Sequence, residues 1–242
     1  MSSTEVGIAY IVAGLLEIIY PIALAFFVKR SQGTSWRVYF IGCAMFLASL
    51  IRIPLNNYAT VTIMGSTIGK YALTLLPLLH SVTAGLFEEG ARYIAYKFLV
   101  KNHTFQNGLM YGVGHGGIES IYLVGASVLS VGVIILTNPS AFTPAQLAAI
   151  IETPLYIPFV GFYERVMAIT IQISLSLIVL ECLRKRDFRY LIAAILIHTA
   201  IDFVALTTIN YGVLYAEVAV TGFALGLGYW SLEKYRSETV KV

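Results

Sequence analysis

Three short groups of polar side chains interrupt a sequence that is otherwise strongly apolar. The groups contain Glu88, Glu89 and Arg92; His115 and Glu119; and His198 and Asp202. Residues three or four apart share one face of a helix, so each group can point in a single direction. Carboxylates and imidazoles are the side chains that bind or deprotonate water. The expected chemistry is therefore hydrolysis by a water molecule that Glu and His activate, directly or through a bound metal.

The composition predicts an integral membrane protein. The 242 residues are 58% hydrophobic and only 12% charged, with a mean hydropathy of +0.79. Soluble domains have about 25% charged residues. We expect an all-α, polytopic membrane helix bundle in the cell membrane, with residues 1–242 forming one integral membrane domain. Its partner is the lipid bilayer, and the net charge of +3 gives no reason to expect a nucleic-acid ligand.

Seven apolar stretches are long enough to cross a hydrocarbon core, which takes roughly 20 helical residues. They lie near residues 7–28, 37–55, 71–97, 106–136, 157–183, 188–208 and 211–232. Basic residues gather after every second stretch, as in cytoplasmic loops. This pattern predicts about seven transmembrane helices, with the N-terminus outside and the C-terminus in the cytoplasm. The loop 138–156 is expected to form a short helix along the outer interface, and residues 56–69 to lie there too.

Exposing the polar groups to lipid would cost more free energy than the fold can supply. A charged residue at the centre of a membrane helix costs roughly 2.5 to 3.5 kcal/mol, so five of them would cost on the order of 12 to 18 kcal/mol. The whole net stability of a typical fold is about 5 to 15 kcal/mol. We therefore expect the three groups to face the bundle interior and to meet at similar depth around one hydrated pocket.

Structural interpretations compete with this functional one. The first group could be an ion-pair network that holds helices together, and His198 with Asp202 could be a local hydrogen bond. Gly108, Gly112 and Gly116 repeat every four residues, which is typical of closely packed membrane helices. A second set of charges is expected to form a structural ion-pair set toward the outer side: Arg52, Glu164, Arg165 and Glu217.

The sequence leaves the cofactor open between none and a divalent metal such as zinc. Possible ligands are Glu88, His115, Glu119 and His198. A carboxylate often orients a histidine that binds a metal, and Asp202 could do so for His198. Cys43 and Cys182 lie in or beside apolar stretches, so no thiolate site or disulfide is expected.

The ordered motifs resemble those of a known family. Glu-Glu-x-x-Arg, then His-x-x-x-Glu within GHGGIES, then His-x-x-x-Asp, on separate membrane helices, look like the YhfC family of glutamic-type intramembrane proteases. That family is related to the CAAX prenyl endopeptidases, the bacterial CPBP proteins and the PrsW proteases. The resemblance covers about residues 70–205, the motif-bearing core. It implies a membrane-embedded or membrane-proximal peptide substrate.

The resemblance also implies roles for the motif residues. Glu88 would be the general base, with Glu89, His115 and His198 as the other catalytic residues, and with Arg92, Glu119 and Asp202 in support. CAAX endopeptidases usually have Glu-Glu-x-x-x-Arg and Phe-x-x-x-His, so either His115 or Glu119 could act here, and they have Asn at the place of Asp202. Relatives with immunity or scaffolding roles leave a non-catalytic protein as an alternative. A proton- or ion-coupled transporter is another, because buried acids and histidines also form proton relays.

Overall fold

The computed structural model describes residues 2–239 and is entirely helical in its regular structure. The principal elements are α1 (Ser3–Gln32), α2 (Trp36–Ser49), α3 (Arg52–Met64), α4 (Ala72–Phe98), α5 (Phe105–Glu119), α6 (Ala126–Thr137), α7 (Pro144–Glu152), α8 (Ile157–Lys185), α9 (Arg189–Thr208) and α10 (Val213–Thr239). A π-helical turn, Ser120–Gly125, joins α5 to α6. The expected all-α membrane bundle is confirmed.

Six helical segments among the described residues are long and apolar enough to cross a membrane. They are Ser3–Gln32, Trp36–Met64, Phe105–Thr137, Ile157–Lys185, Arg189–Tyr211 and Val213–Glu238. The expected count of seven is therefore only partly met. The remaining stretch is α4, whose 27 residues would extend about 40 Å, but its charged motif lowers its apolar character.

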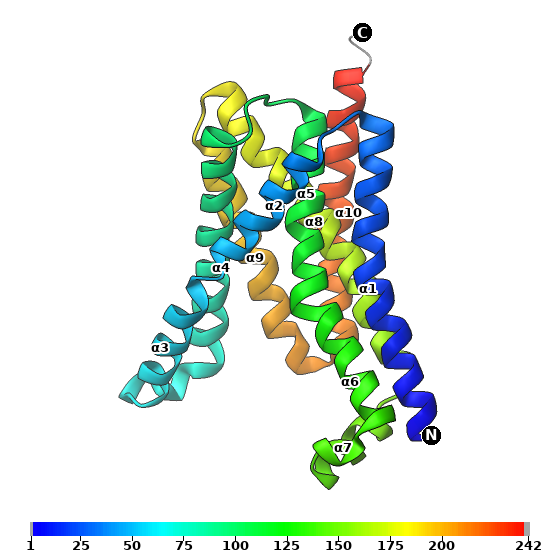
Figure 1. Cartoon of the computed structure of the whole chain (residues 1–242). Helices are drawn as coiled ribbons and strands as arrows, with labels where there is room; N and C mark the ends of the chain where they lie inside the picture. The colour runs from blue at the N-terminus through cyan, green and yellow to red at the C-terminus, as the bar shows by residue number, and fades with distance from the viewer. Residues whose placement is uncertain (1, 240–242) are drawn as a thin grey trace.

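The helices pack around α8, in which Leu175 and Val179 are completely buried. α5 packs against both α2 and α8, α4 runs along α9, and α1 runs along α6. In Figure 1, α3 and the turn that follows it lie at the edge of the molecule, at the end that also holds the N-terminus and α7. The helix expected within 138–156 is thus present as α7.

The second apolar stretch is interrupted, which the spacing of apolar residues does not predict. α2 ends at Ser49 and α3 begins at Arg52. Proline has no N–H, so Pro54 cannot donate to the carbonyl of Leu50 as a continuous helix requires. The N–H of Ile53 bonds to that carbonyl instead, at 2.8 Å. Arg52, which belongs to the site, is the first residue of α3 after this break.

Candidate active site

The carboxylate of Glu88 is the meeting point of four helices. Glu88 belongs to α4 and is 2% exposed. Arg52 of α3 donates from Nη2 to its Oε1 at 2.9 Å. On the other oxygen, His115 Nε2 of α5 lies 3.1 Å from Oε2, and Gln172 of α8 donates to it from Nε2 at 3.3 Å. Glu88 is thus fixed from three sides.

His198 on α9 connects the two adjacent glutamates. Its Nδ1 lies 2.6 Å from Glu89 Oε1, and because an ionised carboxylate can only accept, Nδ1 is the donor. Its Nε2 lies 3.9 Å from Glu88 Oε2 and 3.6 Å from Asp202 Oδ2. Both separations exceed an ordinary hydrogen bond. The orienting carboxylate of His198 is therefore Glu89, whereas the sequence spacing had suggested Asp202.

Arg92 supplies the positive charge that balances the buried carboxylate of Glu89. Its side chain and that of Glu89 are fully buried, and its Nε lies 3.5 Å from Glu89 Oε2. Arg92 Nη1 donates to the Gln172 carbonyl at 2.8 Å and to Ser176 Oγ at 3.1 Å, and Nη2 donates to Gln172 Oε1. Gln172 therefore bridges Arg92 and Glu88.

Glu119 does not interact with His115, although the two share a motif. Its Oε1 accepts from Arg165 Nη1 at 3.1 Å, and its Oε2 accepts from Gln172 Nε2 at 2.7 Å. Arg165 also pairs with Glu164. The charge set expected from the sequence is thus rearranged, because Arg52 pairs with Glu88 while Glu119 joins the group around Arg165.

A polar cavity of about 120 Å³ connects these side chains. Residues from all three motif groups line it, namely Glu88, Glu119, His198 and Asp202, together with Arg52, Gln172 and the Glu164–Arg165 pair. A water molecule occupies about 30 Å³ in the liquid, so the cavity has room for a few. His115 lies behind Glu88, with its ring edge against Phe46 at a centroid distance of 5.1 Å.

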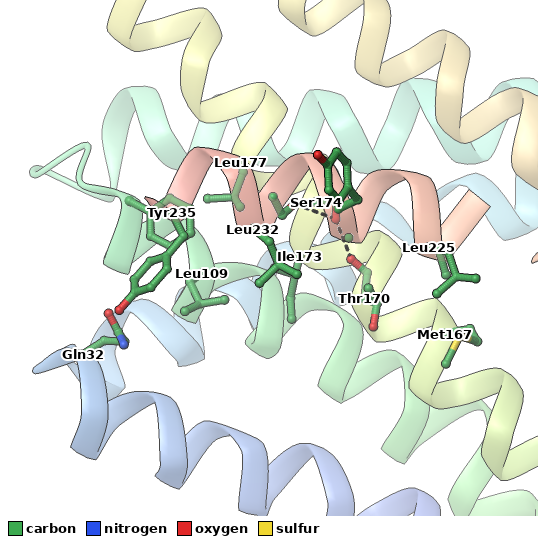
Figure 2. A pocket seen from close by; sticks show the side chains of 15 residues that line it. Gln32, Leu109, Met167, Thr170, Ile173, Ser174, Leu177, Leu225, Leu232 and Tyr235 are labelled. Carbon is green, nitrogen blue, oxygen red and sulfur yellow. Dashed lines mark hydrogen bonds between the residues drawn. The ribbon is translucent and has the colours of Figure 1, made fainter. Parts of the chain in front are cut away.

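A larger groove elsewhere has a different character. It measures about 660 Å³ and runs between α5, α8 and α10, from Gln32 at the end of α1 toward Met167 and Leu225. Figure 2 shows mostly apolar side chains along it, with Ser174 bonding back to Thr170. None of the motif residues lines this groove. It is an apolar surface feature, separate from the polar cavity.

The glycines of α5 bring its neighbours close enough to build the site. A Cβ on Gly112 would lie 2.5 Å from Ile173 Cα, and one on Gly116 would lie 2.9 Å from Gln172 Cβ. The glycine repeat therefore packs α5 against α8, as expected for small residues in membrane helices. This close approach places Gln172 beside both Glu88 and Glu119.

Sequence reasoning missed two residues of the site, Arg52 and Gln172. Each is a polar residue within an apolar stretch, which is a signal that could have been weighted more heavily. Arg52 also directly follows the break between α2 and α3. The described structure brings Glu88, Glu89, Arg92, His115, His198 and Asp202 into one contiguous network, with Glu119 reached through Gln172.

Sequence comparison places this arrangement in a known family. The pattern of the family described as "YhfC intramembrane metalloprotease" matches residues 16–225. The chain belongs to the YhfC family. A similar protein from Bacillus subtilis (strain 168), named "Uncharacterized membrane protein YhfC", is 33% identical over 219 residues, which cover 82% of this chain and 83% of the relative. No solved structure matches the chain.

The YhfC family name implies a metal, and the side chains can be tested against one. Two imidazoles and several carboxylates are suitable donor types for zinc. Their arrangement does not fit, because residues 2–239 contain no group of three or more His, Cys, Asp or Glu that could hold an ion. Glu88 is instead bonded to the cationic Arg52, and Glu119 is turned toward Arg165.

Proposed function

We propose that this member of the YhfC family is an intramembrane peptidase. It hydrolyses a peptide bond in a membrane-embedded or membrane-proximal substrate with a water molecule that Glu88 activates. The observation that carries the proposal is the gap between Glu88 Oε2 and His198 Nε2, which measures 3.9 Å and borders the polar cavity. This separation exceeds a direct hydrogen bond, and a water molecule on the cavity side of the two atoms can bridge them.

The surroundings of His198 Nε2 support a water in this gap. Since Nδ1 carries the hydrogen that binds Glu89, Nε2 faces the carboxylate oxygens of Glu88 and Asp202. Carboxylate oxygens accept hydrogen bonds, and a water molecule in the cavity can donate to them. The water hydrogen-bonds to His198 Nε2 and donates to Glu88 Oε2, which leaves an oxygen lone pair free to attack.

The proposed reaction uses Glu88 twice, first as a base and then as an acid. Glu88 removes a proton from the water while the oxygen of that water bonds to the carbonyl carbon of the substrate. Arg52, a cation that lines the same cavity and contacts Glu88, stabilises the negative charge that develops on the carbonyl oxygen. Glu88 then gives its proton to the nitrogen as the C–N bond breaks, so one acid and one amine leave. His115 and Gln172 hold Glu88 in place throughout.

The membrane arrangement is part of the proposal. We infer that α4 crosses the membrane as a seventh span, since it packs along α9 in the bundle and its charged residues face buried partners. With the N-terminus outside, a cysteine introduced at Ser3 should react with an impermeant maleimide in intact cells. A cysteine at Lys101 should react only after the cells are opened. The reverse pattern would overturn the orientation.

Activity is tested with purified protein in liposomes and a fluorogenic transmembrane peptide. Glu88→Gln and His198→Ala should lower the cleavage rate at least about 100-fold, the scale of a lost general base. The control is Glu181→Gln, which alters another buried acid, paired with Arg184 and Lys185 away from the cavity. Cleavage by both site variants at the wild-type rate would refute the proposal. Loss of folding together with activity would favour a structural role for the motifs.

A further inference from the structure

A second cavity adjoins the polar cavity of the active site. It measures about 300 Å³ and lies between α3, α4 and α9. Arg52 and Asp202 line both cavities, so the two are contiguous at these side chains. The second cavity is further lined by Asn56, Asn57 and His80. None of these three residues has a part in the reaction proposed above.

Asn56 has an unfulfilled hydrogen-bonding requirement in this cavity. It is 6% exposed, and its Oδ1 has no hydrogen-bond partner among the described residues. A buried polar group without a partner costs about 1 to 3 kcal/mol. Across the same cavity, His80 Nε2 lies 3.2 Å from Thr60 Oγ1. A strip of polar groups thus follows α3 and α4 at a position where an apolar span would carry hydrocarbon side chains.

The expected substrate supplies groups that would satisfy this strip. A peptide bond in a transmembrane helix is shielded by the helix, so the segment must unwind before water can reach its carbonyl carbon. Unwinding frees backbone N–H and C=O groups, and each free group costs several kcal/mol in hydrocarbon. An asparagine side chain can both accept and donate a hydrogen bond.

We propose that Asn56, assisted by Asn57 and His80, forms a substrate subsite that hydrogen-bonds to the backbone of an unwound transmembrane segment. Oδ1 of Asn56 accepts from a freed N–H and thereby holds the segment beside Glu88. α3 lies at the edge of the bundle, with Tyr58 and Val61 exposed at 74% and 73%, so a segment can approach this cavity from the lipid. This inference rests on the proposed peptidase function.

Binding can be measured apart from hydrolysis with Glu88→Gln protein in liposomes. The probe is a synthetic transmembrane peptide with a central Gly-Ser-Gly, labelled for energy transfer, and a second peptide carries N-methyl groups on two central nitrogens. The Glu88→Gln protein should bind the N-methylated peptide about 5- to 10-fold more weakly, the effect of losing one hydrogen bond. Adding Asn56→Leu should weaken binding of the unmethylated peptide by a similar factor and leave the methylated one unchanged.

The control substitution is Asn210→Leu, which lies outside both cavities and should not alter either affinity. If Asn56→Leu weakens binding of both peptides equally, or of neither, the subsite is overturned. The two peptides are also compared on Glu88→Gln protein that retains Asn56, so this comparison does not depend on whether Asn56→Leu folds. Equal affinities of the two peptides for that protein would overturn the subsite. A methylation-sensitive affinity that Asn56→Leu abolishes, without any cleavage by wild type, would uphold the subsite and reject the peptidase.

Discussion

Glu89 is bound to the Nδ1 atom of His198 through a contact of 2.6 Å, and this contact sets which way the imidazole faces. With Nδ1 held, Nε2 is left to face Glu88 and Asp202. The two adjacent glutamates therefore have different positions in the site. Glu88 borders the cavity, while Glu89 lies behind His198 and is fully buried. We therefore propose that Glu89 is a positioning residue.

The first prediction concerns this contact. Glu89→Gln removes the charge that favours Nδ1–H and lets an amide NH₂ face the imidazole instead, so His198 loses its fixed orientation. We expect kcat to fall about 10- to 100-fold, as for partners that orient a functional histidine. Cleavage of the fluorogenic transmembrane peptide provides the measurement, with Glu181→Gln as the control. An unchanged kcat would show that Glu89 does not orient His198.

The second prediction concerns the stability of the buried ion pair. Arg92→Leu leaves the fully buried carboxylate of Glu89 without its cation and should destabilise the protein by about 3 to 5 kcal/mol. The double variant with Glu89→Leu removes both charges, so it should recover much of that loss. Unfolding by SDS titration in mixed micelles measures both. Additive losses in the double variant would mean that the two side chains do not interact.

The third prediction concerns the packing of α5 on α8. Gly112→Ala places a Cβ 2.5 Å from the backbone Cα of Ile173, which forces the helices apart. We expect a loss of stability of about 1 to 3 kcal/mol and reduced activity, because Gln172 moves with α8. Gly90→Ala is the matched control, since a Cβ there meets nothing within 4 Å. Equal effects of the two substitutions would contradict the close-packing argument.

The fourth prediction concerns the metal that the family name implies. The donors around Glu88 do not enclose an ion, and Arg52 places a positive charge on its carboxylate. We expect cleavage to be unaffected by 1,10-phenanthroline, and purified protein to contain much less than one metal ion per chain. Stoichiometric zinc, together with activity that is lost on chelation and restored by zinc, would establish a metalloenzyme instead.

The sequence by itself determined the class of fold and most of the residues that gather at the site. Apolar stretches of sufficient length predict the spanning segments, and six of the expected seven meet that description in the structure. Helical periodicity puts Glu88 and Arg92, or His198 and Asp202, on common faces. The high cost of charge in hydrocarbon then requires these faces to turn inward. Each of these features is local in the sequence or depends on composition alone.

Tertiary structure decided which partners these residues take. His198 binds Glu89 rather than Asp202, and Glu119 binds Arg165 rather than a group of its own motif. Such contacts depend on how each helix is rotated and shifted along its axis relative to its neighbours. Spacing within one helix does not contain that information. The packing of the helices supplies it. α3 packs on α4 and places Arg52 at Glu88, and the glycine-mediated approach of α5 to α8 places Gln172 there.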